Sequence, residues 1–572
     1  MTKFTSRIIL ISILVLAIFL RLFRIDQVPA RLTHDEMSLG YNTYSILKTG
    51  KDEWGRLLPL DFEAFGDHKL PAYIYFSVPF IALFGLTPIA TKMVSFISGI
   101  LVILLLYKLT KLLLGKEKLA LITSLCMAIS PWAIHISRMA LESHLALAFF
   151  MSGLYFFIKG WKENKRKIIY LSSIFFGLTF YAYIAYRLII VLLAFSFGIY
   201  LIIKERKYIK TWIIWGLGIT IVVFPLITLL FTNSGTARLK QVSLFSNPGI
   251  VMTVDEKRSL CYLVEPNVLP KICSLFFHKP GEFFKQFAGN YFSLLSPEFL
   301  FLSGDKNLYL ANPGYGEFIL IFLPFYIVGL YVLMKLKGKE ALLLKICFFI
   351  APIPSALVES PQIVRASLVL PLIVFCIGLG LYQFIQWLQS YKYKRLLYLI
   401  SITLITFFNM QYFLDYFYIY PAQYDNAAYP FDQRVANYIK KNEDQAEKIF
   451  IDKDFPDSYI LLAFYNKFDP AWLQQNIVRN NIDSYGFSHP KILGKMEFVD
   501  APYAMVKSYL CQYPNQNYIF ISKPYLDILN TETYYNFVHV HPQVSIFNTK
   551  QLRENLQKTG ALAGFCGADS TL

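Results

Sequence analysis

Long apolar runs separated by short polar segments dominate the first 415 residues of the chain. Most of these runs could cross the hydrocarbon core of a bilayer, which is about 30 Å thick. The pattern predicts eleven membrane-spanning helices, near residues 8–20, 88–110, 117–134, 140–158, 168–185, 187–203, 211–231, 316–334, 341–357, 363–388 and 396–415. The first run is short enough for the core of a signal peptide. Because Arg21 and Arg24 can extend the reach of this run toward the outer interface, we expect the run to be an uncleaved membrane span.

The polar connections between the runs are of two kinds. Short, densely basic connections occur at Lys108–Lys118, Lys159–Lys167, Lys204–Lys210, Lys335–Lys345 and Lys392–Arg395. Long, less basic connections occur at residues 25–87, 232–315 and 416–572. Since short basic loops stay in the cytoplasm, we expect a multi-pass protein of the cell (inner or plasma) membrane. Its N-terminus would be cytoplasmic, and an odd number of spans would place the long segments and the C-terminus outside.

The pattern changes after the last apolar run, where short strand-like runs alternate with helical ones. The predicted strands are Lys448–Asp452, Asn517–Ser522, Val538–His541 and Val544–Asn548. The predicted helices are Asp432–Lys441, Pro456–Lys467 and Ala504–Gln512. The fold class is therefore a polytopic α-helical membrane protein with a C-terminal extracytoplasmic α/β domain. We expect a transmembrane catalytic domain over residues 1–415 and a soluble domain over residues 416–572.

Composition supports a membrane protein. Hydrophobic residues make up 55% of the chain and charged residues 16%, against roughly 25% charged in soluble domains. This excludes cytosolic soluble enzymes and disordered chains. A net charge of +17 could indicate nucleic-acid binding in a soluble protein, but the basic loops explain it here, so we expect no nucleic acid as a partner.

The seven cysteines lack the CxxC spacing of zinc or redox sites. Two of them lie in one outer loop, at Cys261 and Cys273, and two in the tail, at Cys511 and Cys566. Because an outer-face location permits oxidation, two disulfides are possible.

Ionisable residues outside the basic connections lie near the outer ends of the predicted spans. Transporters place essential charges near mid-membrane, where these spans carry almost none. This distribution disfavours a transporter or flippase and indicates a site at the outer interface. The residues concerned are His34, Asp35, Glu36, His68, Lys69, His135, Arg138, Glu142, Arg187, Arg238, Glu317, Glu359 and Arg365.

The first outer loop carries the most informative motifs. Thr33 and Glu36 have the spacing of a capping box, at the start of a predicted helix. That role accounts for Glu36 but leaves Asp35 unexplained. The loop then closes on the sequence His-Lys-Leu-Pro-Ala-Tyr at residues 68–73, in which Lys69 could also be an ordinary interfacial lysine.

Three further outer turns each carry an arginine: Arg138, Arg187 and Arg365. Together with Lys69 they offer cations at one depth of the membrane, which would suit a lipid phosphate. Arg138 and Glu142 are four residues apart, so they could instead form a helical ion pair.

These motifs resemble the class C glycosyltransferases, in particular the protein O-mannosyltransferases and the aminoarabinose transferases of lipid A. The shared features are an acidic pair after the first span, the segment at residues 68–73, and a Ser-Pro…Arg…Glu turn over residues 130–142. The resemblance implies an outward-facing cavity with two juxtamembrane helices and a polyprenyl-phosphate-linked sugar as donor. The chain has no inserted lumenal domain of the eukaryotic type, and its tail identifies no acceptor. The sugar and the acceptor, whether lipid, glycan or protein, therefore stay open.

The expected chemistry needs one base and several cations. Asp35 would take the proton of the acceptor hydroxyl, with inversion at the anomeric carbon, while Lys69, Arg138, Arg187 and Arg365 hold the phosphate. Glu142 keeps a covalent sugar intermediate open as an alternative. Glu36 is expected to serve as a helix cap rather than as a catalyst. Further cavity candidates are His34, His68, Tyr73, Arg238 and Glu317.

No cofactor is required by this chemistry. His34, Asp35 and His68 could hold a divalent metal, but they lack further ligand spacing, so no metal is assigned. A polymerase or ligase of lipid-linked glycans would share the same chemistry. A receptor or scaffold that works through its tail is a further alternative, in which Asp35, Lys69 and Arg138 would tolerate substitution while changes in the tail would not.

Overall fold

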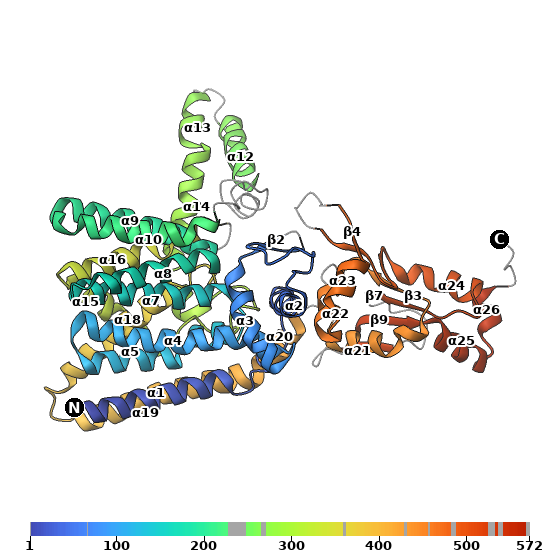
Figure 1. The fold of residues 1–572 in the computed structure, drawn as a ribbon, viewed down its shortest axis with the longest axis horizontal. Helices are drawn as coiled ribbons and strands as arrows, with labels where there is room; N and C mark the ends of the chain where they lie inside the picture. The colour runs from blue at the N-terminus through green and yellow to red at the C-terminus, as the bar shows by residue number, and fades with distance from the viewer. Residues whose placement is uncertain are drawn as a thin grey trace. The chain divides into compact units, whose positions relative to one another are not determined.

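The computed structural model describes residues 2–65, 67–226, 248–264, 270–358, 362–427, 432–455, 458–481, 488–523, 532–535 and 542–567. The chain divides into two compact units (Figure 1). We call the first the helical unit, comprising Met1–Val28, Leu70–Tyr73 and Lys92–Tyr420. The second, which we call the sheet unit, comprises Pro29–Lys69, Ile74–Thr91 and Pro421–Leu572. In the structure, most of the first outer loop thus groups with the tail, not with the membrane helices.

Each of the eleven predicted spans coincides with a helix. Among the described residues, seven helices are long and apolar enough to cross a membrane, or eight if one bent pair counts as a span. The seven are α1 (Lys3–Leu22), α4 (Pro88–Leu114), α7 (Glu142–Lys162), α9 (Ile184–Lys204), Arg206–Leu226 with α10 (Ile209–Val223), α18 (Val369–Leu388), and Lys394–Tyr424 with α19 (Lys394–Leu414). The bent pair is α5 (Glu117–Ile129) and α6 (Pro131–Ser137). Three predicted spans correspond to shorter helices: α8 (Arg166–Ala182), α15 (Leu323–Lys335) and α16 (Lys339–Ile350).

The long helices of this unit run alongside one another (Figure 1). Other helices of the unit are short or lie in connections: α12 (Pro248–Val264), α13 (Pro270–Phe276), α14 (Lys279–Ser293) and α17 (Ile353–Ala356). Helix α20 (Tyr420–Ala427) begins at the last residue of the helical unit, and its remaining residues belong to the sheet unit. The multi-pass membrane architecture predicted from the hydropathy pattern is confirmed.

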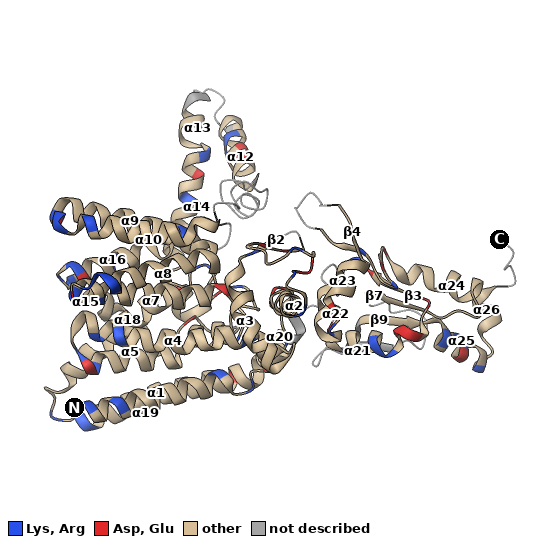
Figure 2. Cartoon of the chain, viewed as in Figure 1, with Lys and Arg blue, Asp and Glu red and all other residues tan. Residues whose placement is uncertain are grey.

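The basic connections meet at one end of the helical unit. Lys162 donates to the Leu112 carbonyl at 2.7 Å and pairs with Glu340 at 3.6 Å. Lys339 lies over the rings of Trp161 and Tyr208. Four of the five basic connections are joined by these contacts. Figure 2 shows Lys and Arg gathered at this end of the helices, where α1 begins.

Arg21 does not extend to the membrane surface as the sequence suggested. Its side chain is fully buried and donates to the carbonyls of Met127 and Ala128, at 3.3 and 2.9 Å. These carbonyls lie where α5 ends before Pro131, which has no N–H to offer Met127. The helix break therefore leaves carbonyls without helical partners, and the guanidinium of α1 satisfies them.

The sheet unit contains a seven-stranded mixed sheet in the order β4-β5-β6-β3-β7-β9-β8 and a separate hairpin of β1 and β2. The central strand β3 is parallel to both of its neighbours, β6 and β7. The strands are β1 (Phe62–Ala64), β2 (Asp67–Lys69), β3 (Lys448–Asp452), β4 (Ile477–Arg479), β5 (Pro490–Leu493), β6 (Met496–Val499), β7 (Tyr518–Ser522), β8 (Glu532–Tyr535) and β9 (Pro542–Asn548).

The helices of the sheet unit include the three predicted for the tail. They are α2 (His34–Thr49), α3 (Pro71–Phe84), whose first turn belongs to the helical unit, α21 (Gln433–Asn442), α22 (Ser458–Asn466), α23 (Pro470–Asn476), α24 (Val506–Gln512), α25 (Thr549–Lys558) and α26 (Leu562–Cys566). The predicted α/β class of the tail is confirmed. Three of the four predicted strands are present, and the fourth, Val538–His541, lies outside the described residues.

Alternating side chains of β3 build two cores on opposite faces of the sheet. Ile449 and Ile451 belong to the core that contains α22, and Phe450 belongs to the core that contains α24. Met37 and Tyr41 of α2 join the first core. The first outer loop is therefore packed against the tail by apolar burial, which stabilises its position within the sheet unit.

Both possible disulfides are formed. Cys261 is bonded to Cys273 in the helical unit, and Cys511 to Cys566 in the sheet unit. The free cysteines of the described chain, Cys126, Cys347 and Cys376, are buried.

Candidate active site

The predicted capping box at the start of α2 is present. The Thr33 hydroxyl accepts from the Glu36 N–H at 3.2 Å, and the Glu36 carboxylate accepts from the Thr33 N–H at 3.0 Å. Glu36 is only 1% exposed. Its carboxylate therefore serves the helix end, as its position in the motif predicts.

Asp35, the neighbouring carboxylate, projects differently. It forms an ion pair with the ammonium of Lys69, and its side chain remains 55% exposed while that of Lys69 is 2% exposed. Lys69 ends strand β2, where it lies opposite Phe62 of β1. His34 Nε2 lies 3.8 Å from the other carboxylate oxygen of Asp35. The structure thus brings together Asp35, Lys69 and His34 from two distant parts of the first outer loop.

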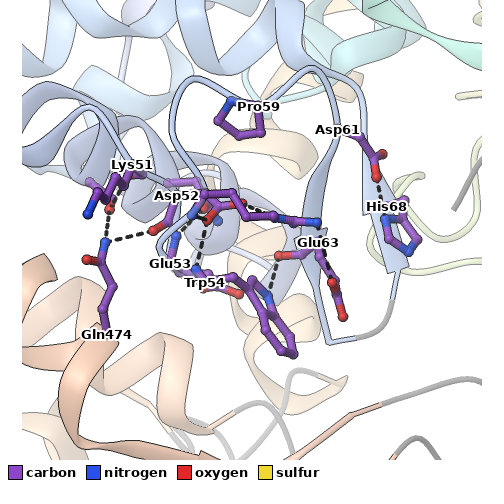
Figure 3. Close-up of polar contacts among 12 residues, drawn as sticks. Lys51, Asp52, Glu53, Trp54, Pro59, Asp61, Glu63, His68 and Gln474 are labelled. Atoms are coloured by element: carbon purple, nitrogen blue, oxygen red, sulfur yellow. Dashed lines mark hydrogen bonds and ion pairs between the residues drawn. The ribbon is translucent and has the colours of Figure 1, made fainter. Parts of the chain in front are cut away.

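The hairpin that carries Lys69 is held by its own polar network (Figure 3). Trp54 Nε1 donates to the Glu63 carbonyl at 2.9 Å, and His68 Nδ1 lies 2.6 Å from the Asp61 carboxylate. Burial lowers the pKa of His68, but the hydrogen bond and charge of Asp61 outweigh it, so the pKa lies above its usual value. His68 is therefore a partner of Asp61. In the part of the chain that the structure describes, no three His, Cys, Asp or Glu side chains are placed to hold a metal.

A buried polar cluster around Glu53 was not predicted from the sequence. Glu53 is fully buried and accepts from the Tyr459 hydroxyl at 3.0 Å. Arg479 lies 3.9 Å from the Glu53 carboxylate and stacks on the Trp54 ring at 3.7 Å. Burial raises the pKa of Glu53 to about 7, although Arg479 and Tyr459 oppose the shift. Since these partners are some 400 residues apart in sequence, no local pattern indicates them.

Arg138 contacts backbone carbonyls in the helical unit. Its guanidinium is fully buried and donates to the carbonyls of Leu20, Arg21, Arg24 and Val28 at 2.9–3.1 Å. The first two of these carbonyls lie in the last turn of α1 and the other two beyond its end, where helical N–H partners run out. In this structure Arg138 therefore acts as a cap for α1, which is a different role from the predicted phosphate contact.

Arg187 and Arg365 lie at two other ends of helices in the helical unit. Arg187 donates twice to the Phe180 carbonyl, at 3.1 and 3.0 Å, in the last turn of α8. Arg365 is half-buried, and its charge lies near Asp305. Burial raises the pKa of the Asp305 carboxyl, while hydrogen bonds from backbone N–H groups and the charge of Arg365 oppose that shift.

The remaining predicted residues of the helical unit have separate environments. Glu142 is half-buried at the first position of α7, where the helix dipole stabilises a carboxylate. Glu317 is buried and accepts from the Asp305 N–H at 2.8 Å. Tyr73 is buried with its hydroxyl 3.2 Å from that of Ser95. Arg238 and Glu359 lie outside the described residues.

Comparisons with known proteins bear on this fold. Residues 68–231 match the family described as dolichyl-phosphate-mannose-protein mannosyltransferase. ArnT from Cupriavidus metallidurans bound to undecaprenyl phosphate is similar with 11% identity and a TM-score of 0.57, over 96% of this chain and 98% of that chain. Archaeal oligosaccharyltransferase AglB from Archaeoglobus fulgidus, in complex with an inhibitory peptide and a dolichol-phosphate, has 14% identity and a TM-score of 0.48, over 81% of this chain and 64% of that chain. No curated protein matches the chain in sequence.

The chain therefore has the fold of ArnT along nearly its whole length. The resemblance to class C glycosyltransferases, which rested on motifs in the first outer loop and the turn after the third span, is confirmed. The family match and the shared fold also confirm the predicted class, a multi-pass membrane glycosyltransferase.

Proposed function

We propose that this protein transfers a sugar from a polyprenyl-phosphate donor to an acceptor hydroxyl on the outer face of the cell membrane. The observation that carries the proposal is the half-exposed carboxylate of Asp35, held against the buried ammonium of Lys69. The bound undecaprenyl phosphate of ArnT, which has the same fold, supports a lipid phosphate as the leaving group.

Asp35 is the proposed base. Its exposure leaves the carboxylate accessible to an acceptor, and the adjacent ammonium favours its ionised form, which a base requires. Asp35 takes the proton of the acceptor hydroxyl as the acceptor oxygen bonds to the anomeric carbon. The bond from that carbon to the phosphate oxygen breaks with its electron pair, leaving polyprenyl phosphate and inverting the anomeric centre.

Lys69 is the proposed link between base and leaving group. An ammonium has three N–H donors, so it can contact Asp35 and a phosphate oxygen together. Charge that develops on the phosphate is then stabilised by a group already fixed in place. Arg365 is retained as a second candidate cation, whereas the carbonyl contacts of Arg138 and Arg187 favour structural roles.

The disulfides and the basic connections support one orientation of the chain. Disulfides persist in oxidising compartments, which supports an outer location for Cys261–Cys273 and Cys511–Cys566. The basic connections meet at one end of the helical unit, and that end is expected in the cytoplasm. We therefore infer a cytoplasmic N-terminus and an extracytoplasmic sheet unit.

The proposal is tested by donor choice with the purified protein in lipid nanodiscs. Polyprenyl-phosphate-linked sugars should yield free polyprenyl phosphate and a glycosylated acceptor, whereas nucleotide sugars should yield neither. Transport of the lipid-linked sugar without cleavage would instead support the flippase alternative. A product that remains on a polyprenyl diphosphate would support the polymerase or ligase alternative.

A further inference from the structure

The sheet unit contains a cavity that the mechanism above does not use. Its volume is about 370 Å³, and it is lined by Lys453, Asp454, Asn480, His489, Pro490 and Phe498. Lys453 and Asp454 directly follow β3, and Phe498 lies in β6. The cavity therefore opens at the carboxyl ends of two adjacent parallel strands.

The topology of the sheet accounts for a cavity at this edge. After β3 the chain enters α22, which packs on the face that carries Ile449 and Ile451. After β6 it enters α24, which packs on the opposite face with Phe450. Where connections leave neighbouring parallel strands toward opposite faces, a crevice opens outside their carboxyl ends, and ligands bind in such crevices in α/β proteins.

The charges at the rim of the cavity are compensated. Lys453 pairs with Asp500 at 2.6 Å, and Asp454 pairs with Lys523 at 2.5 Å. A phosphate or a carboxylate would meet no surplus of positive charge there. A ligand with neutral groups that both donate and accept hydrogen bonds suits this rim better, because ammonium, carboxylate and amide groups stand beside one another.

The inner wall of the cavity is apolar. Phe498 is 8% exposed and Pro490 is buried. The face of a sugar ring carries C–H groups that pack on such a surface, while its hydroxyls reach polar groups at the rim. Apolar wall and polar rim together favour a neutral saccharide.

Two contacts connect the neighbours of the cavity residues to the first outer loop within the sheet unit. Asn480 follows Arg479, whose guanidinium stacks on Trp54 of the first outer loop at 3.7 Å. On the other side, the N–H of Ser488, next to His489, donates to the Phe65 carbonyl at 3.0 Å. Phe65 lies in the hairpin that carries Lys69, and its ring contacts His34 with centroids 5.7 Å apart.

We infer that this cavity binds a neutral saccharide unit of the acceptor and so holds the acceptor beside Asp35. The acceptor role of the bound saccharide rests on the proposed function. Saccharide binding itself rests on the cavity alone. The amide of Asn480 and the carboxylate of Asp454 bind the sugar hydroxyls, while Phe498 supports the ring.

The test measures binding to the full chain in nanodiscs without any donor lipid. The neutral probes are mannobiose, maltose and chitobiose, and the anionic probes are glucuronate and inorganic phosphate, each titrated by calorimetry. At least one neutral disaccharide should bind in the millimolar range, and Asn480→Ala should weaken it about tenfold, as expected when one hydrogen bond is lost. Gln475→Ala, which removes an exposed amide from α23, is the matched control and should bind as the wild type does.

Two results would overturn the inference. In the first, every neutral probe binds Asn480→Ala as tightly as it binds the wild type. In the second, an anionic probe binds the wild type more tightly than every neutral probe does.

A transfer assay separates the two proposals. Saccharide binding without any transfer from a lipid donor would remove the proposed function and leave the saccharide site. Transfer in which Asn480→Ala keeps the wild-type KM for the acceptor would remove the acceptor role alone.

Discussion

Arg21 and Arg138 each satisfy the carbonyl end of a helix other than their own. Arg21 of α1 donates to the carbonyls where α5 stops, and Arg138, which follows α6, donates to the carbonyls where α1 stops. Each guanidinium matches several carbonyls at once, which the single ammonium of a lysine could not do with the same geometry. Sequence alone places both residues near an interface, but it does not reveal which helix end each one reaches.

Replacing Arg138 is predicted to destabilise the protein. Arg138→Ala leaves four buried carbonyl contacts unmade, so we expect a loss of roughly 3 kcal/mol or more in unfolding free energy. Thermal unfolding of the purified protein checks this, with the exposed Arg166→Ala as a control that should change little. An Arg138→Ala protein with wild-type stability but weakened donor binding would restore the phosphate role.

Glu53 is predicted to make stability depend on pH. Its pKa is raised from 4.5 to about 7 in the folded protein, so the folded state holds a proton that the unfolded state has lost within this range. The contribution of Glu53 to stability is therefore largest below about pH 4.5 and is lost as pH rises through about 7. The difference amounts to roughly 3 kcal/mol across the shift.

Unfolding of the wild type and of Glu53→Gln, compared at pH 5 and pH 8, checks this linkage. The neutral amide has no proton to lose, so the variant should lose less stability between the two pH values than the wild type does. Other titrating groups, such as His68, are present in both proteins and cancel in the comparison. Equal losses in both proteins would show that Glu53 does not titrate in this range.

Helices α15 and α18 are in backbone contact at two glycines. A Cβ added to Gly329 would lie 1.7 Å from the Cys376 carbonyl, and one added to Gly380 would lie 1.9 Å from the Phe325 carbonyl. Small residues permit such close approach of membrane helices. The pairing of these two helices therefore depends on the absence of side chains at both positions.

Gly380→Ala is predicted to separate α15 from α18. The obstruction is backbone, which cannot rotate away, so the cost should reach at least the 1–3 kcal/mol typical of overpacked cores. The yield of monodisperse protein and its melting temperature measure the effect. Gly216→Ala on α10 is the matched control, because nothing lies within 4 Å of its added Cβ; equal behaviour of the two variants would contradict the close contact.

Local patterns predicted many elements of the fold. The hydropathy runs gave the positions of the membrane helices, and the Thr33–Glu36 spacing gave the capping box. The strand-like apolar run within Lys448–Asp452 predicted the central strand. Each of these signals lies within a few residues, where side-chain periodicity and capping chemistry act directly.

Contacts between distant segments were not predictable in the same way. The packing of Tyr41 and Phe65 against Tyr459 and Phe464 follows from the tertiary arrangement, which no local period encodes. The pairing of Asp35 with Lys69 depends on the hairpin between them, whose register a single sequence does not specify.

The arrangement of the whole molecule across the membrane can be tested with its natural cysteines. The free thiols Cys126, Cys347 and Cys376 are buried, so accessible thiols of the described chain should appear only after reduction of Cys261–Cys273 and Cys511–Cys566. A membrane-impermeant thiol reagent added to intact cells should then label the reduced protein. Labelling only after permeabilisation would place both segments in the cytoplasm and contradict the orientation.

The account of the whole enzyme depends most on Asp35 as the base. Glu36, its neighbour, is the ideal comparison, because it caps α2 and is 1% exposed while Asp35 is half-exposed. Asp35→Asn preserves size and most hydrogen bonding but removes the base. Glu36→Gln keeps an acceptor for the capping box, so it should retain most activity.

The most direct test is the rate of sugar transfer from a polyprenyl-phosphate donor by purified Asp35→Asn and Glu36→Gln, measured alongside donor binding. The account predicts that Asp35→Asn lowers the rate by at least about 100-fold, which is the lower end of the range for general base catalysis. Folding and donor binding should be retained. Transfer by Asp35→Asn at the wild-type rate would contradict the role of Asp35 as the base.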